Sequence, residues 1–191
     1  MNSIAQLMQT GKTVFATQEI KDVFGIPTEA GLYSFLQRAK KDGRLLNPQK
    51  GVWTLPVYNA KELAGALFPG GYISLASVLF EAGVSFQRYG NTTSCVWHKA
   101  ADIYFNDQNY TAQKIKASMY NNDTCIQTFD GYRKAMPERA LCDLVYLWPQ
   151  AHFDNPQYFQ NASSQSRLEK LLPLYPKTTQ RHVMKLITQQ I

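Results

Sequence analysis

A short break between two amphipathic segments constrains the N-terminal part of this chain more than any other feature. Gly25 ends a predicted helix that begins with Thr17 as its N-cap, and Pro27 prevents its continuation. Thr28 is a favourable N-cap for the next helix, which we expect over residues 28–42. Two helices joined by so short a turn are typical of a helix-turn-helix.

The flanking segments extend this motif. An amphipathic helix is expected within the first ten residues, and two short apolar segments, 44–46 and 52–55, surround the turn-rich residues 47–51. The two segments predict a β-hairpin with one apolar face. Three helices followed by a hairpin describe a winged helix-turn-helix domain, which we assign to residues 1–58.

The polar face of the 28–42 helix combines small side chains with long hydrogen-bond donors. Gln37 and Arg38 can bond to base edges, whereas Lys, Ser and Tyr side chains can hold phosphates. The candidate DNA-binding residues on this helix and the hairpin are Thr28, Tyr33, Ser34, Gln37, Arg38, Lys40, Lys41, Arg44 and Lys50. We expect this domain to bind double-stranded DNA, and the alternative is that it docks a protein partner instead.

The distribution of charge also favours a polyanionic partner. The 191 residues include 20 Lys and Arg against 14 Asp and Glu, a net charge of +6 that many enzymes share. Residues 1–60 carry seven basic and four acidic side chains, and five of the seven basic ones fall within residues 38–50. Asp42 is the only acid in that segment, so the positive charge is concentrated where the DNA contacts are expected.

Residues 59–191 predict a second, α+β domain. Five segments rich in β-forming residues lie within 92–136 and are separated by Asn, Asp and Gly, so we expect a small antiparallel sheet. Ser74 is the expected N-cap of a helix before the strands, and Pro137 is the expected first residue of a strong helix after them. C-terminal helices follow, the last of them over residues 178–191.

Two helical segments of this second domain carry a family pattern. Residues 72–84, YISLASVLFEAGV, are similar to Y-[IV]-S-L-x-S-A-L, and residues 135–147, AMPERALCDLVYL, are similar to A-x-P-[EK]-[RK]-A-L-x-D-L-[LIV]-Y-L. These are patterns of the AbiEi family of antitoxins from type IV toxin–antitoxin systems. The chain resembles that family over roughly residues 5–148, with a winged helix followed by the two patterns in the same order.

The resemblance implies a regulator rather than an enzyme. Such a protein would bind an operator, which we expect to be an inverted repeat, repress its own operon and counteract a nucleotidyltransferase-like toxin. The matching residues are Ser74, Pro137, Glu138, Arg139 and Asp143. A proline and an acid favour the start of a helix and Arg139 and Asp143 form an i, i+4 pair, so we favour a structural role for them over contact with a partner.

The sequence offers little support for a cofactor or metal site. Cys95, Cys125 and Cys142 form no C-x-x-C pair, the histidines lack ligand spacing, and no glycine-rich phosphate loop is present, so we expect neither. Unpaired thiols favour the reducing cytoplasm, and no apolar run approaches the ~20 residues of a membrane span.

One enzymatic alternative is a nuclease-like cluster on the sheet. Its members would be Asp102, Asp107, Asp123 and Asp130, together with Lys114 and Lys116. Turn propensity explains these aspartates more simply.

Overall fold

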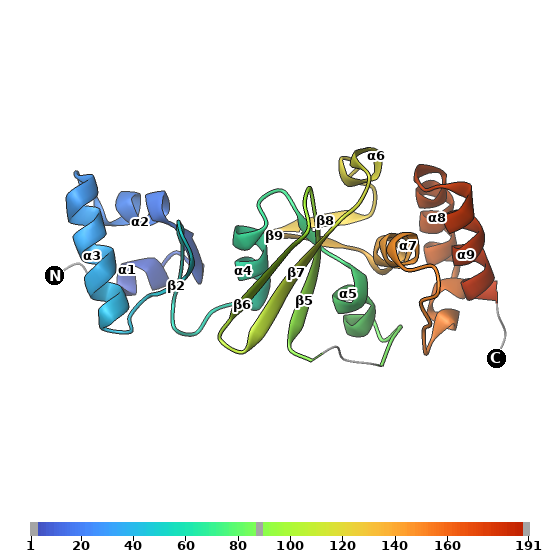
Figure 1. Ribbon diagram of the computed structural model, residues 1–191, viewed down its shortest axis with the longest axis horizontal. Helices are drawn as coiled ribbons and strands as arrows, with labels where there is room; N and C mark the ends of the chain where they lie inside the picture. The colour runs from blue at the N-terminus through green and yellow to red at the C-terminus, as the bar shows by residue number, and fades with distance from the viewer. Residues whose placement is uncertain (1–3, 87–89, 189–191) are drawn as a thin grey trace. The chain divides into compact units, whose positions relative to one another are not determined.

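The computed structural model describes residues 4–86 and 90–188. The chain divides into two compact units (Figure 1). The first contains residues 1–69 and 130–132, and the second contains residues 70–129 and 133–191. Both units combine helices with strands, so the expected α+β class is confirmed.

The first unit joins short helices to a three-stranded antiparallel sheet of order β1-β3-β2. Its elements are α1 (Ala5–Met8), β1 (Val14–Ala16), α2 (Thr17–Phe24), α3 (Glu29–Lys41), β2 (Leu46–Gln49), β3 (Val52–Thr54) and α4 (Ala60–Leu67). The expected hairpin is present as β2 and β3. The extended residues that precede α2 form β1, which adds a third strand by pairing with β3.

The end of α2 and the start of α3 lie at the residues that the sequence predicts. Gly25 ends α2 with a left-handed backbone, φ +58°, which residues with a Cβ rarely adopt. Thr28 is the N-cap of α3, where its hydroxyl oxygen accepts a hydrogen bond from the backbone N–H of Gly31 at 3.2 Å. Both boundaries of the short connection are therefore set by local chemistry.

Two details of the first unit differ from expectation. Ala16, and not Thr17, is the N-cap of α2, because the Glu19 carboxylate accepts a hydrogen bond from the Ala16 backbone N–H at 2.6 Å. The Thr17 hydroxyl instead accepts a hydrogen bond from the indole N–H of Trp53 at 3.0 Å. Strand β2 also runs through Pro48, in the expected loop, because an edge strand tolerates a proline.

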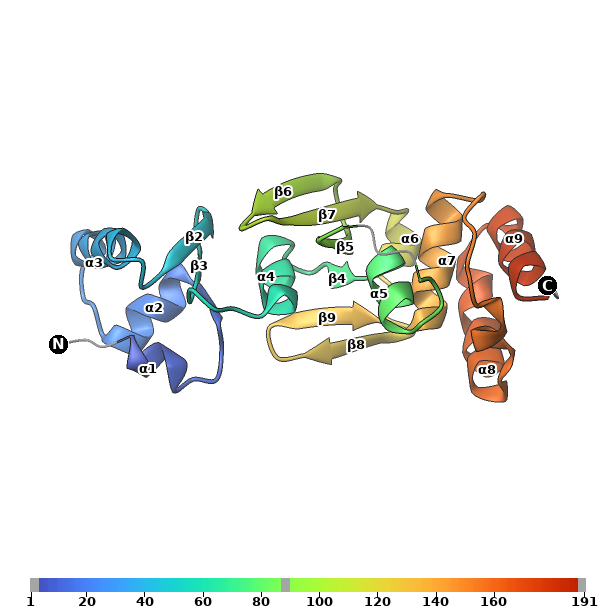
Figure 2. The same cartoon turned by 90° about the horizontal axis from the view of Figure 1, so that it is seen from below.

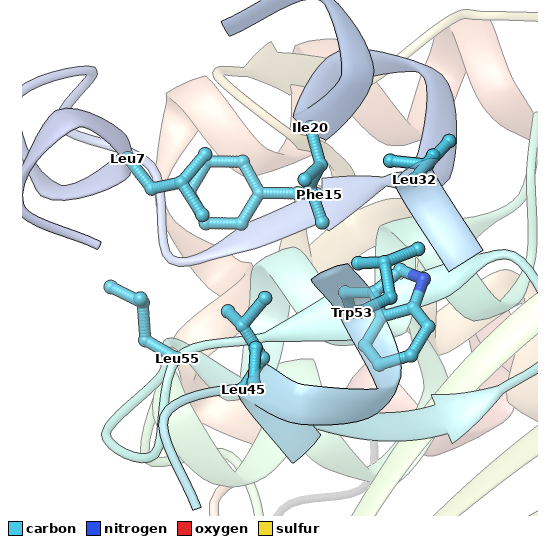
Figure 3. Close-up of a cluster of buried hydrophobic side chains, with 9 residues drawn as sticks. Leu7, Phe15, Ile20, Leu32, Leu45, Trp53 and Leu55 are labelled. Atoms are coloured by element: carbon cyan, nitrogen blue, oxygen red, sulfur yellow. The ribbon is translucent and has the colours of Figure 1, made fainter. Parts of the chain in front are cut away.

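Apolar side chains from both the helices and the strands form the core of the first unit (Figure 3). The buried cluster consists of Leu7, Phe15, Ile20, Leu32, Leu36, Ala39, Leu45, Trp53 and Leu55. The members from α3 recur at intervals of three and four residues, so they lie on one face of that helix. The opposite face of α3 is consequently left at the surface.

Helix α4 belongs to the first unit, which ends after residue 69, whereas we expected a boundary after residue 58. The Glu62 carboxylate accepts hydrogen bonds from the backbone N–H and the hydroxyl of Thr13, both at 2.8 Å. Gly65 packs so closely against the turn at residues 130–132 that a Cβ there would lie 2.2 Å from the carbonyl oxygen of Gly131. These contacts hold α4 and the turn within the first unit.

The second unit is built on a six-stranded sheet of order β6-β7-β5-β4-β9-β8 (Figure 2). The strands are β4 (Tyr72–Ile73), β5 (Thr92–Trp97), β6 (Ala101–Phe105), β7 (Gln108–Lys114), β8 (Ile126–Phe129) and β9 (Tyr132–Ala135). The five expected strand segments are all present. Strand β4 is additional and joins the two halves of the sheet, since it pairs with both β5 and β9.

The sheet is mixed, so the expectation of an antiparallel sheet is wrong. Strand β5 pairs in parallel with β7, and β4 pairs in parallel with β9. Asn106 and Asp107, both with positive φ, fold β6 back onto β7 as a tight hairpin. Because β7 carries the fully buried Tyr110 and Ala112, it lies beside β5, and the partly exposed β6 becomes the edge.

Five α-helices accompany this sheet in the described part of the second unit. They are α5 (Leu75–Glu81), α6 (Ala117–Tyr120), α7 (Pro137–Leu147), α8 (Ala162–Leu171) and α9 (Lys177–Thr188). Pro137 lies in the first turn of α7, as expected. The last helix starts at Lys177, and its expected end at residue 191 lies outside the described residues. Ser74 is the N-cap residue of α5, as expected, but its hydroxyl makes no capping hydrogen bond there.

Replacing Gly65 with Ala tests the close packing of α4. Helix propensity alone would make this variant more stable by about 1 kcal/mol. We expect the clash with the Gly131 carbonyl to dominate instead and to lower the free energy of unfolding by about 1–3 kcal/mol, measured by urea denaturation. The matched control is Gly31→Ala in α3, whose new Cβ would meet only side-chain atoms and which should change stability by less. A Gly65→Ala protein at least as stable as the parent would contradict this packing.

Candidate functional site

The outer face of α3 and the segment that follows it carry the candidate DNA-binding residues. Each of the nine candidates lies at an exposed position: Thr28, Tyr33, Ser34, Gln37, Arg38, Lys40, Lys41, Arg44 and Lys50. Tyr33 is 66% exposed, although large aromatic side chains are more often at least partly buried. Exposure on one helix face follows directly from burial of the opposite face, where Leu32, Leu36 and Ala39 join the core.

Some of these side chains already have partners within the unit. Thr28 uses its hydroxyl oxygen to cap α3, and the Arg38 Nε–H donates to the Ser34 carbonyl oxygen at 3.2 Å. Arg44 pairs with Asp42 at 2.7 Å. Within residues 4–86 and 90–188, by contrast, Lys40 and Lys41 form no ion pair, so their charges are available to a partner.

An acid near the start of α3 could have opposed the binding of phosphate. Glu29 is the acidic residue in the first turn of α3, and it forms an ion pair with Lys21 of α2. The pair cancels the charge of Glu29 and links the two helices across their turn. The N-terminal end of α3 therefore carries no net negative charge from this residue.

Helix α3 is followed by the β2–β3 hairpin, and Figure 2 shows both along the same edge of the first unit. Lys50 belongs to the two-residue connection between β2 and β3. Arg44 lies in the connection between α3 and β2.

A second group of candidate residues, those of the family pattern, lies in the interior of the second unit. Asp143 of α7 is fully buried, and its carboxylate accepts four hydrogen bonds. Arg139 Nε–H and the Tyr175 hydroxyl donate to Oδ1 at 3.2 and 2.5 Å, and the Ser74 and Tyr72 hydroxyls donate to Oδ2 at 2.9 and 3.1 Å. We call these five residues the Asp143 network.

Arg139 extends the Asp143 network to the backbone around α6. Its guanidinium is fully buried and donates to the carbonyl oxygens of Met119 at 2.7 Å and Asn122 at 2.9 Å, and to the Tyr72 hydroxyl at 2.9 Å. A buried guanidinium is tolerated only when its donors are satisfied in this way. The predicted Arg139–Asp143 pair is confirmed as a buried ion pair.

Burial also governs the protonation of the Asp143 network. It raises the pKa of the Asp143 carboxyl, while Arg139 and the hydroxyl donors act in the opposite direction. It likewise raises the pKa of Tyr72 and Tyr175, so both hydroxyls keep the protons that they donate.

Glu138 is likewise buried, beside the network in the first turn of α7. Its Oε1 accepts a hydrogen bond from the Ser164 hydroxyl at 2.6 Å and pairs with Arg167 at 3.1 Å. Both partners lie on α8, so Glu138 ties α8 to α7. A direct surface contact by Glu138, Arg139 or Asp143 is incompatible with their burial, which supports the structural interpretation of the pattern.

Tyr72 and Tyr175 are members of this network that the sequence alone does not reveal. Tyr72 opens the first family segment, which is a usable signal, because residues two apart in an extended segment point to the same side and Tyr72 can therefore share the partner of Ser74. Tyr175 lies 32 residues after Asp143, in a stretch with no pattern that links the two. Contacts of this range are invisible to helical or strand periodicity.

The aspartates of the nuclease alternative do not gather at one place. Asp102 lies on β6, Asp107 in the β6–β7 turn, and Asp123 is paired with Arg133. Across residues 4–86 and 90–188, no three His, Cys, Asp or Glu side chains are grouped as metal ligands would be. Over the same ranges, none of the helices has the length and apolarity that crossing a bilayer requires.

Comparisons with known proteins place the fold but not the activity. No protein-family model matches the chain, and no curated protein matches it either. Among solved structures, the chain is similar to the crystal structure of the Rv2827c protein from Mycobacterium tuberculosis, with a TM-score of 0.62 and 13% sequence identity. The match covers 96% of this chain and 74% of that one, so it includes both units. At this identity the likeness shows a shared fold alone.

Removing the carboxylate of Asp143 tests the network. Asp143→Ala leaves Arg139 buried without its counter-charge, and we expect a loss of about 3–5 kcal/mol in the free energy of unfolding. The control is Asp123→Ala, which breaks the more exposed pair with Arg133 and should cost less than about 1 kcal/mol. Both losses are measured by urea denaturation. Similar losses in the two variants would mean that the buried network stabilises the fold no more than the exposed ion pair does.

Proposed function

We propose that the first unit is a winged helix-turn-helix module that binds double-stranded DNA through α3, and that the chain is a transcriptional regulator. The observation that carries this proposal is the outer face of α3. It presents Gln37, Arg38, Lys40 and Lys41 at exposed positions, on a helix whose other face is fixed in the core. A rigid helix with one free basic face is what reading a groove requires.

The order and size of the elements support this proposal. Two helices with a short turn are followed by a hairpin, and α3 has 13 residues, which makes it about 20 Å long. An α-helix with its side chains is ~10–12 Å in diameter, so it fits the major groove of B-DNA, which is ~12 Å wide. Ala30 and Ser34 are small residues at exposed positions of α3, so the backbone could approach the bases closely.

The side chains of α3 divide into two roles under this proposal. Gln37 can make paired hydrogen bonds to adenine, and Arg38 can make them to guanine. Lys40, Lys41 and Arg44 near the end of the helix would neutralise phosphates and so add a contribution that depends on salt. Specificity would then come from the first pair and much of the affinity from the second group.

The wider role rests on the AbiEi resemblance of residues 72–84 and 135–147. Ser74 of the first segment and Arg139 and Asp143 of the second are buried in one network, so the two segments contact each other and together stabilise the second unit. We propose on this basis that the chain, without catalysing a reaction, represses its own operon in the cytoplasm. We also propose that it counteracts a nucleotidyltransferase-like toxin encoded beside it.

The DNA-binding proposal predicts a mobility shift of the promoter upstream of the chain's own gene. Binding should require an inverted repeat and should weaken steeply with added salt, because phosphate contacts release counterions. Gln37→Ala or Arg38→Ala should weaken specific binding by about 1–3 kcal/mol, or roughly 5- to 150-fold in Kd. Gln127→Ala, at an exposed position on β8 in the second unit, is the matched control and should leave binding unchanged.

Two outcomes would count against this proposal. Wild-type affinity in both α3 variants would remove the recognition role of α3. A promoter that is not shifted, together with a stable protein complex on pull-down, would favour docking of a protein partner by the first unit.

The antitoxin proposal predicts that repression and toxin neutralisation can be separated. Co-expression of the chain should restore the growth of cells that produce the neighbouring nucleotidyltransferase. The Gln37→Ala, Arg38→Ala double variant should lose repression of a promoter reporter but should still restore growth, because the second unit is unchanged. No rescue of growth by the wild-type chain would refute the antitoxin role.

A further inference from the structure

A group of basic and aromatic side chains lies at one end of the six-stranded sheet, far in sequence from α3. Strand β5 ends at Trp97, whose register partner on the parallel strand β7 is Lys114. His98 and Lys99 lie in the connection from β5 to β6, and Lys116 follows β7. We call these five residues the basic sheet end.

Three side chains of the basic sheet end, those of Trp97, His98 and Lys99, contact one another. The Lys99 ammonium lies over the Trp97 ring, 4.8 Å from its centroid. The His98 ring meets Trp97 edge-on, with 4.1 Å between the ring centroids and 61° between the planes. Register partners on neighbouring strands lie on the same face of a sheet, which places Lys114 beside this aromatic pair.

The positive charge of the basic sheet end is not compensated locally. Lys99, Lys114 and Lys116 are all exposed, and no acid in residues 4–86 or 90–188 lies within ion-pair distance of any of them. The nearby strand β9 shows the opposite case, since its Arg133 is paired with Asp123. Three lysines without an acidic partner at one end of the sheet favour a partner with several negative charges.

We propose that the basic sheet end binds single-stranded nucleic acid. The three lysines provide contacts for successive phosphates, and Trp97 and His98 provide aromatic rings on which bases stack. Only unpaired bases offer their flat faces for stacking, so the aromatic pair favours a single strand over a duplex. This surface goes beyond the operator binding proposed for α3 and does not depend on it.

Lys99 links the two kinds of contact. Its ammonium is held over the indole by a weak attraction, and the residue is exposed. A base that stacks against the ring displaces the ammonium, which is then free to pair with the adjacent phosphate. The same lysine therefore covers the ring in the free protein and contacts the backbone of the strand in the complex.

Fluorescence anisotropy of the full chain tests this proposal, with a labelled oligothymidylate of about 15 nucleotides as the probe. The triple variant Lys99→Ala, Lys114→Ala, Lys116→Ala should weaken binding at least roughly ten-fold at about 50 mM KCl. It should also reduce the slope of log Kd against log salt by about 2, since each phosphate contact on a single strand contributes ~0.7. His98→Ala, which changes an exposed ring and removes no lysine, should weaken binding by a smaller factor.

Two further variants separate this surface from others. Lys177→Ala, Arg181→Ala, Lys185→Ala removes three basic charges from exposed positions of α9 and should change Kd by less than about two-fold if position matters more than net charge. The Gln37→Ala, Arg38→Ala double variant should bind the oligothymidylate as the wild type does, whatever its effect on promoter DNA. Failure of the α3 proposal would thus leave this measurement intact.

Three results would overturn the proposal. The first is the absence of binding to the oligothymidylate by the wild-type chain at about 50 mM KCl. The second is an equal loss of affinity in the triple lysine variant for a blunt duplex of the same length and unrelated sequence, since this surface would then not favour a single strand. The third is an equal loss of affinity in the α9 variant, which would reduce the effect to net charge.

Discussion

The buried carboxylate of Asp143 is the contact on which the second unit depends most. It accepts hydrogen bonds from Tyr72 on β4, Ser74 before α5, Arg139 on α7 and Tyr175 before α9. A buried charge that loses its partner costs several kcal/mol, so these segments must all be in place for any of them to be stable. A recurring sequence pattern in this region consequently has a structural explanation, and functional contacts have to be sought on other surfaces of the molecule.

The first unit is organised differently, around an apolar cluster and a tight turn. Leu32 and Leu36 fix one face of α3 in the core, and Gly25 and Thr28 set the position at which the helix starts. The opposite face of α3 then lies at the surface with its basic and amide side chains exposed. A rigid helix presents these groups with little loss of conformational entropy on binding, which is an advantage when a groove of DNA is read.

Helical periodicity explains why the candidate site could be predicted better than the sheet. The positions of Leu32 and Leu36 determine both faces of α3, so the exposure of Gln37 and Arg38 follows from local sequence. Strand β4 is only two residues long and has no detectable pattern, and the parallel pairing of β5 with β7 depends on burial of Tyr110 rather than on any local signal. At Ser74 a long-range partner outweighed a local preference, since the hydroxyl bonds to α7 instead of capping α5.

The claim that α3 reads DNA sequence is tested most directly by selection of duplexes from a random pool with the full chain. We expect the wild-type chain to enrich one inverted-repeat sequence. The Gln37→Ala, Arg38→Ala double variant should retain salt-sensitive binding but enrich no sequence, because only base contacts carry specificity. Enrichment of the same sequence by both proteins would contradict the assignment of α3. The absence of enrichment by the wild-type chain would contradict sequence-specific DNA binding as a whole.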